Sequence, residues 1–134
     1  NQIALNFLKF FNTFKKSNPL ICFAAKSNSN LSILRILGRL GSGADVVSGG
    51  ELLKALKAGI KPKKIVFSGV GKTSKEINYA IEKKILLINA ESKSEIKEIE
   101  KIAKADEGVK RHLDGLEIKK VIFVPNKLIN FIAV

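Results

Sequence analysis

The sequence ICFAAKSNSNL at residues 21–31 places an apolar run directly before a polar turn and the start of a helix. The run is too continuous to leave one face in water, which is typical of a strand in a parallel sheet. Asn30 is a good N-cap, because its side-chain oxygen can accept a hydrogen bond from the first helical turn. The stretch therefore predicts a strand, a turn and a helix in immediate succession.

This unit recurs along the chain. Apolar runs long enough for strands occupy residues 19–25, 44–47, 64–68 and 85–89. Helical periodicity follows each run, at residues 31–40, 50–58, 74–84 and 93–105, and Gly41 and Gly59 supply stops for the first two helices. Strands that alternate with helices of this length form βαβ units with a parallel sheet. The predicted fold class is α/β, with about four βα units.

Three of the predicted helices begin with the same signature. A capping box, S/T-x-x-E, satisfies two backbone N–H groups reciprocally at a helix start. The matching pairs are Ser48 with Glu51, Thr73 with Glu76, and Ser92 with Glu95. Three matches in phase with three strands are much stronger evidence than one.

The two ends of the chain depart from the repeated unit. Residues 1–16 have the pattern of an amphipathic helix, without the basic start or cleavage site of a signal peptide. After residue 105 the chain becomes polar, and residues 119–124 and 128–134 are predicted strands of a β-hairpin. We therefore expect a domain of βα units over residues 1–105, followed by a linker and hairpin over residues 106–134; the family resemblance given below implies that the first part is a partial barrel.

Composition limits the class of protein. The chain has 134 residues, of which 46% are apolar, and no run approaches the roughly 20 apolar residues of a membrane span. Cys22 is the single cysteine, so no internal disulfide is possible. We expect a cytoplasmic protein with no membrane partner.

The net charge of +12 raises the possibility of a nucleic-acid partner. The cations are spread over every predicted helix, and 21 of the 24 are Lys, whereas base readout and phosphate clamps draw mainly on Arg. A Lys-rich nucleic-acid-binding protein is retained only as an alternative function.

Several motifs are incomplete. Residues 69–73, GVGKT, lack the first glycine of a P-loop because Val66 stands there, and residues 41–43, GSG, lack the third glycine of a dinucleotide fingerprint. His112 and Cys22 each stand alone, so the sequence predicts neither a metal site nor a Cys/His nucleophile pair.

Lys26 has a position that favours function. It follows an apolar strand directly, and side chains at the carboxyl ends of barrel strands carry the chemistry of most barrel enzymes. A lysine placed there can act as a nucleophilic amine.

A family resemblance covers roughly residues 1–105. Residues 23–31, FAAKSNSNL, resemble the Y-A-V-K-A-N-x-N segment of the diaminopimelate decarboxylase family, pyridoxal-phosphate-dependent enzymes with a (β/α) TIM-type barrel. Residues 43–52, 65–73 and 88–92 resemble the next three strand-to-helix turns of that family.

The resemblance implies specific roles. Lys26 would bind pyridoxal 5'-phosphate covalently, Asp45 would lie beside it, and Ser48 and Glu51 would cap the second helix. The implied reaction is decarboxylation of meso-diaminopimelate, a small-molecule amino-acid substrate, to L-lysine. The cofactor serves as the electron sink in such reactions.

Other family segments have no counterpart here: the histidine that stacks on the cofactor, the glycine-rich phosphate loop, and the E-P-G-R and C-E-S motifs. We therefore expect a truncated form that retains the cofactor lysine but lacks full activity, and whose half-barrels pair as a homo-oligomer to cover open sheet edges. A noncatalytic module that binds pyridoxal phosphate or another protein is the alternative.

Overall fold

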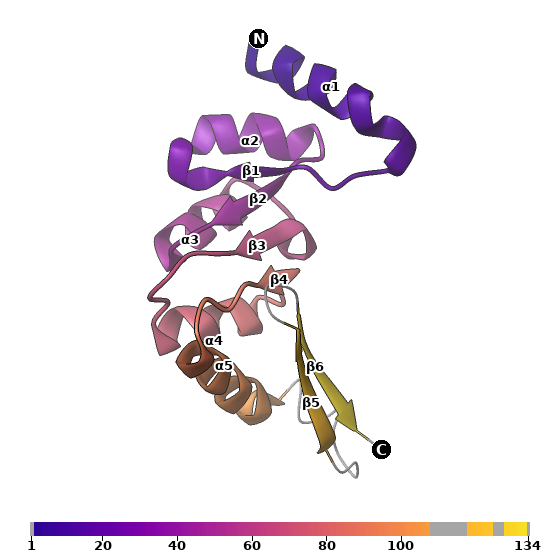
Figure 1. Ribbon diagram of the computed structural model, residues 1–134. Coiled ribbons are helices and arrows are strands. Elements are labelled where there is room, and N and C mark those ends of the chain that lie inside the picture. Colours follow the sequence, from indigo (N-terminus) through magenta and orange to yellow (C-terminus); the bar gives the residue numbers. More distant parts are fainter. Residues whose placement is uncertain (1, 108–117, 125–127, 134) are drawn as a thin grey trace.

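A computed structural model describes residues 2–107, 118–124 and 128–133, with side chains over residues 2–107 (Figure 1). The helices are α1 (Gln2–Phe14), α2 (Leu31–Arg39), α3 (Gly49–Lys57), α4 (Ser74–Glu82) and α5 (Lys93–Ala105), with 3-10 turns η1 (Lys15–Ser17), η2 (Ala25–Ser27) and η3 (Pro62–Lys64). The strands are β1 (Cys22–Ala24), β2 (Gly43–Val46), β3 (Ile65–Phe67), β4 (Leu87–Ile88), β5 (Ile118–Val124) and β6 (Leu128–Ala133).

Strands β1 to β4 form one parallel sheet in chain order. One register row runs across the sheet from Ala24 through Asp45 and Val66 to Leu87. Consecutive parallel strands joined by helices are the repeating pattern of a (β/α) barrel, and four such strands are half of the eight that a closed barrel has. The predicted α/β class with four βα units is confirmed.

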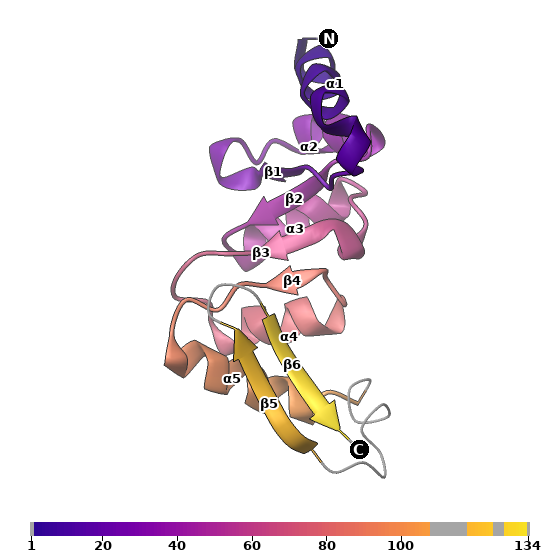
Figure 2. The same ribbon diagram turned by 45° about the vertical axis from the view of Figure 1, so that its right-hand side comes forward.

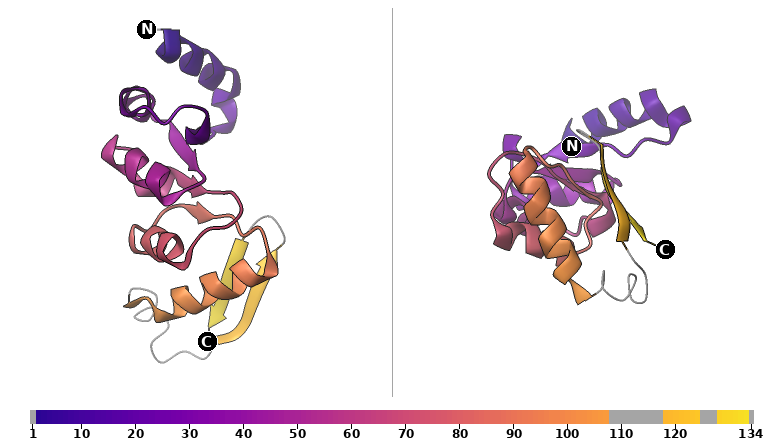
Figure 3. Two further views of the ribbon diagram at one scale, coloured as in Figure 1. Left: turned by 90° about the vertical axis from the view of Figure 1, so that its left-hand side faces the viewer. Right: turned by 60° about the horizontal axis from the view of Figure 1, so that its bottom comes forward.

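The two faces of this sheet are unequal. Helices α2, α3 and α4 cover one face (Figure 3). On the two central strands the residues of that face have no exposed surface, namely Ala44, Val46, Ile65 and Phe67, whereas Phe23 and Ile88 on the outer strands are partly buried. The opposite face carries the half-buried Cys22, Ala24, Asp45 and Val66. The apolar runs had suggested burial on both faces; among the described residues, only the helical side of β2 and β3 is fully covered.

Helix boundaries agree closely with the sequence patterns. Gly41 and Gly59 follow α2 and α3 with φ of +93° and +87°, the left-handed conformation that ends helices. Asn30 accepts a hydrogen bond from the Ser32 N–H, as an N-cap does. Helix α5 spans the predicted residues 93–105.

Of the three predicted capping boxes, only the pair Thr73 and Glu76 forms the complete arrangement. Ser48 and Ser92 do accept from the N–H groups of Glu51 and Glu95. The two glutamates, however, reach one residue further back, to the N–H groups of Val47 and Glu91. They therefore tie the end of the preceding strand or turn to the helix start.

The strands are shorter than the apolar runs that predicted them. The run at residues 19–25 yields only Cys22–Ala24, because Ala25 to Ser27 turn into η2. Lys26 consequently lies in the turn after β1, not on the strand itself. The run at residues 85–89 yields only Leu87–Ile88, since Leu86 donates its N–H to Pro62 and Ile65.

Strands β5 and β6 pair antiparallel as a separate two-stranded sheet (Figure 2). The predicted hairpin is confirmed in its strands and their pairing. Residues 108–117 and 125–127, which include His112 and the predicted turn, lie outside the described residues. None of the described helices has the length and apolar character needed to cross a membrane.

Candidate functional site

The candidate site lies at the carboxyl edge of the parallel sheet, where the strands lead into their helices. Each strand places a polar residue at this edge: Lys26 after β1, Asp45 in β2, Ser68 after β3 and Asn89 after β4. Because parallel strands all end at one edge, residues from distant parts of the chain meet there. The carboxyl edge is where barrel enzymes carry their active sites.

Asp45, Ser68 and Asn89 form a hydrogen-bonded chain along the edge. The Asn89 side-chain amide donates to the Ser68 hydroxyl at 3.0 Å, and that hydroxyl donates to the Asp45 carboxylate at 2.7 Å. The backbone supports the chain, because the N–H groups of Ser68 and Asn89 donate to the preceding strands at Val46 and Phe67. This Asp45–Ser68–Asn89 chain fixes one carboxylate oxygen of Asp45.

Lys26 has an exposed side chain at the same edge of the sheet as the Asp45–Ser68–Asn89 chain. It lies two residues beyond Ala24, which pairs with Asp45 in the sheet register. Its turn is ordered locally, since the Ser27 hydroxyl donates to the Ala24 carbonyl at 2.7 Å. Within residues 2–107, no hydrogen bond or ion pair joins Lys26 to Asp45. The structure thus brings the two predicted residues to the same edge without direct contact.

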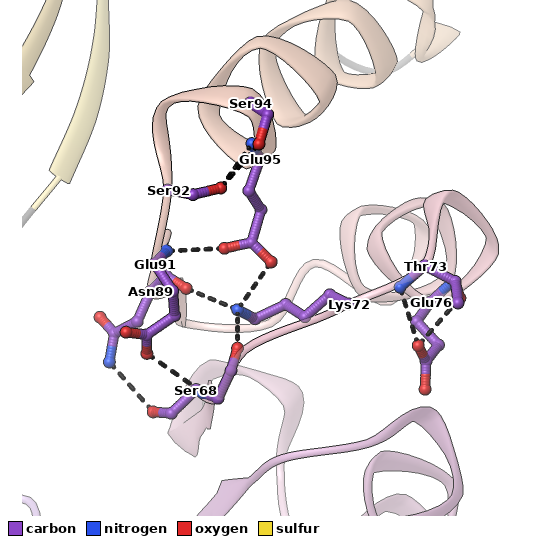
Figure 4. A network of polar contacts seen from close by, with 10 residues as sticks. Ser68, Lys72, Thr73, Glu76, Asn89, Glu91, Ser92, Ser94 and Glu95 are labelled. Atoms are coloured by element: carbon purple, nitrogen blue, oxygen red, sulfur yellow. Dashed lines mark hydrogen bonds and ion pairs between the residues drawn. The ribbon is translucent and has the colours of Figure 1, made fainter.

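Lys72 is the second lysine near this edge, and its environment is very different (Figure 4). Its side chain is 1% exposed. The ammonium group donates to the carbonyls of Gly69 and Asn89 at 2.6 and 2.7 Å, and pairs with the Glu95 carboxylate at 3.1 Å. It also lies 5.7 Å from the centre of the Phe67 ring. All three donors of the ammonium are therefore used in binding three segments together.

The hydrogen-bond network around Lys72 also includes the turn between β4 and α5. The second oxygen of Glu95 accepts from the Glu91 N–H at 2.6 Å, and the Glu91 carboxylate accepts from the Gly69 N–H at 3.2 Å (Figure 4). The turns after β3 and β4 are thus joined by side chains and backbone in both directions.

Glu76 ties together the starts of two helices. It completes the capping box of α4 and also accepts from the Gly49 N–H of α3 at 2.6 Å. The backbone hydrogen bonds from Thr73 and Gly49 lower the pKa of the Glu76 carboxyl, because they stabilise its charged form. A Cβ on Gly49 would lie 2.9 Å from the Glu76 side chain, so this close approach favours glycine.

Cys22 lies on the open face of the sheet. Burial, and to a smaller extent the Asp45 carboxylate, raises the pKa of its thiol. A thiol shifted in this direction is a poor nucleophile near neutral pH. The interpretation of Cys22 as structural is consistent with this environment. No group of three or more metal-ligating side chains occurs within the described residues.

The sequence predicted Lys26 from its position and Asp45 from the family resemblance as site residues, and it did not single out Ser68, Asn89 or Lys72. Ser68 and Asn89 carry a signal similar to the one that marked Lys26, since each is the polar residue at the carboxyl end of an apolar run. Lys72 lies in the rejected P-loop motif and in the family resemblance over residues 65–73. Neither pattern indicated that its side chain is buried against protein carbonyls and a carboxylate.

Comparison with known proteins agrees with this geometry. Residues 1–120 match the family model described as pyridoxal-dependent decarboxylase, pyridoxal binding domain. The chain therefore belongs to the pyridoxal-binding barrel family of these decarboxylases, and the cofactor of the family is pyridoxal phosphate.

Within that family the strong similarity is to diaminopimelate decarboxylase. The enzyme of Helicobacter pylori is 56% identical over 105 residues, which are 78% of this chain and 26% of the relative. The enzyme of Aquifex aeolicus is 50% identical over 101 residues, 73% of this chain and 24% of the relative. This chain thus spans about a quarter of the length of the curated relatives it matches.

The crystal structure of the Helicobacter pylori enzyme complexed with L-lysine superimposes with a TM-score of 0.75 at 55% identity, over 77% of this chain and 26% of that one. The predicted family resemblance is confirmed, and the partial-barrel fold with it.

Proposed function

We propose that this chain is the amino-terminal part of a pyridoxal-phosphate-dependent decarboxylase barrel, with Lys26 as the covalent attachment point for the cofactor and Asp45 as a neighbouring cofactor-binding residue. The observation that carries the proposal is that the exposed Lys26 lies at the same carboxyl edge of the sheet as the Asp45–Ser68–Asn89 chain.

The donor set fits the cofactor. An accessible amine is the group that an aldehyde requires, and Lys26 is exposed at the edge where barrel ligands bind. Asp45 supplies a half-buried carboxylate whose orientation is fixed by Ser68. Pyridoxal phosphate, when bound, supplies the electron sink for loss of carbon dioxide. The protein residues at this edge would orient and hold it.

By similarity to the diaminopimelate decarboxylases, the proposed substrate is meso-diaminopimelate and the proposed product L-lysine, formed in the cytoplasm. We propose a division into a partial barrel over residues 1–105 and a linker with hairpin over residues 106–134. We also propose that residues 1–134 by themselves lack full activity, since the His, E-P-G-R and C-E-S segments of the family have no counterpart in them.

The test is cofactor labelling. Pyridoxal phosphate is added to the purified chain, the adduct is fixed with borohydride, and modified lysines are located by peptide mass spectrometry. We expect selective labelling of Lys26, its loss in Lys26→Ala, and no change in Lys57→Ala, which removes an exposed lysine from α3. Labelling spread evenly over the surface lysines would contradict the proposal.

A companion assay separates the two functional alternatives. Release of carbon dioxide from meso-diaminopimelate by the chain supplied with pyridoxal phosphate, without borohydride, would support the decarboxylase. Selective Lys26 labelling without turnover would instead favour a noncatalytic cofactor-binding module.

We further propose that two copies pair through their open sheet faces. The half-buried residues Cys22, Ala24 and Val66 leave apolar surface on that face, and parallel sheets normally have both faces covered. Analytical ultracentrifugation at micromolar concentration should show a dimer or larger closed oligomer, and Val66→Lys should shift it toward monomer. A monodisperse wild-type monomer would contradict the pairing.

A further inference from the structure

The buried cation at Lys72 lies beside the polar chain of the candidate site rather than within it. Its two carbonyl partners belong to Gly69, the residue after Ser68, and to Asn89 itself. The ammonium therefore holds the backbone of both turns whose side chains form the Asp45–Ser68–Asn89 chain (Figure 4).

Burial makes this contact specific. The Lys72 side chain is 1% exposed, so replacing its partners by water would require the two turns to move apart, and its hydrogen bonds favour one arrangement of them. Glu95 supplies the compensating charge from α5, at 9% exposure. A displacement of either turn would leave the buried ammonium short of a partner, which is costly.

We propose that Lys72 is a positioning residue for the proposed cofactor site, fixing the turns that carry Ser68 and Asn89 and, through them, the Asp45 carboxylate. The inference rests on the proposed function, because only that function gives Asp45 a role in binding the cofactor. Lys72 itself contacts the carbonyls, Glu95 and the Phe67 ring, and has no role as an attachment point.

The experiment needs a background in which loss of the lysine leaves no buried charge. Glu95→Gln is the reference, since glutamine keeps an oxygen that can accept from the Glu91 N–H. Lys72→Met with Glu95→Gln is the test variant and retains the apolar stem. Lys75→Met with Glu95→Gln is the matched control, because Lys75 is exposed on α4 in the same segment.

The readout is the ratio of borohydride-fixed cofactor on Lys26 to that on the other lysines, measured where circular dichroism shows folded protein. We expect the control to match the Glu95→Gln reference, and the ratio in the test variant to fall about tenfold below that reference, as displacement of a supporting group can do. A folded test variant with the selectivity of the reference would overturn the proposal.

Two additions keep the outcome decisive. If the test variant does not fold, Lys72→Gln with Glu95→Gln supplies two N–H donors on a shorter side chain in place of the three of the ammonium, and we expect a smaller loss of selectivity relative to the reference; unchanged selectivity would overturn the proposal. A Ser68→Ala background tests the route: the test variant should add nothing to the loss caused by Ser68→Ala, whereas multiplied losses would exclude action through Ser68.

Failure of the proposed function has its own signature, which is absence of Lys26 selectivity in the wild type. Positioning is then judged from amide hydrogen exchange without cofactor. The Ser68 and Asn89 amides, which donate to Val46 and Phe67, should exchange about tenfold faster in the test variant, while the remote Ile60 amide is unchanged. Equal rates in reference and test variant would overturn the positioning role itself.

Discussion

Lys26 and Lys72 follow strands of the same sheet at the same edge, yet the fold treats them in opposite ways. Lys26 is exposed in a 3-10 turn, whereas the side chain of Lys72 is buried with three hydrogen-bond partners. An amine that must react with an aldehyde has to be accessible and able to lose its proton. An amine committed to two carbonyls and a carboxylate serves stability instead. Neighbours, and not residue type or strand position, separate the two roles.

The largest expected effect is on stability at Lys72. Lys72→Met leaves the Glu95 carboxylate buried without its partner, and we expect a loss of about 3 kcal/mol in the free energy of unfolding. Lys26→Met should change it by less than about 0.5 kcal/mol, as surface substitutions do. Urea unfolding followed by circular dichroism measures both. Equal losses in the two variants would remove the distinction between the lysines.

A smaller effect on stability is expected at the Asp45–Ser68–Asn89 chain. Ser68→Ala removes the donor to Asp45 and the acceptor for Asn89, and should cost about 1 kcal/mol of unfolding free energy. The selectivity of Lys26 labelling should fall by a larger factor than the one to which this change in unfolding free energy corresponds. Thr13→Ala, which removes an exposed hydroxyl from α1, serves as the control. A Ser68→Ala protein whose Lys26 is labelled as in the wild type would show that the Asp45–Ser68–Asn89 chain does not affect cofactor binding at Lys26.

The smallest effect concerns pH dependence in the Lys72 segment. The pKa of Glu76 is lowered in the folded state, so its contribution to stability is present above the unfolded pKa and is lost as pH falls through the folded pKa. Glu76→Gln should cost about 1 kcal/mol or less at pH 7, the typical size of a capping interaction.

This difference should shrink as the pH falls below about 4, where glutamate is increasingly protonated even in the unfolded chain. Thermal unfolding of both proteins between pH 7 and pH 3 measures it. A constant difference across that range would mean that the charge of Glu76 contributes nothing. Glu82→Gln, on the same helix, provides a matched comparison.

Local signals in the sequence predicted the helices better than the strands. Asn30, Ser48, Thr73 and Ser92 act within one helical turn of themselves, so their patterns depend on no distant residue. The strand length depends on a neighbour to pair with. Leu86 donates to Pro62 and Ile65 instead of extending β4, which no pattern within residues 85–89 could indicate.

The sequence by itself determined the repeated βα unit, the helix starts and stops, the family, and the two residues proposed to bind cofactor. Each of these depends on residues close together in the chain or on a contiguous motif. Only the tertiary structure decided that Ser68 and Asn89 form a hydrogen-bonded chain with Asp45. The same holds for the burial of Lys72 and its hydrogen bonds to the turns after β3 and β4.

The physical reason is distance along the chain. Lys72 binds acceptors at Gly69, Asn89 and Glu95, and the parallel register brings Asp45, Ser68 and Asn89 together from three separate strands. Hydrogen bonds of this kind form only after the sheet has paired, so the chemistry of each side chain follows from the packing around it.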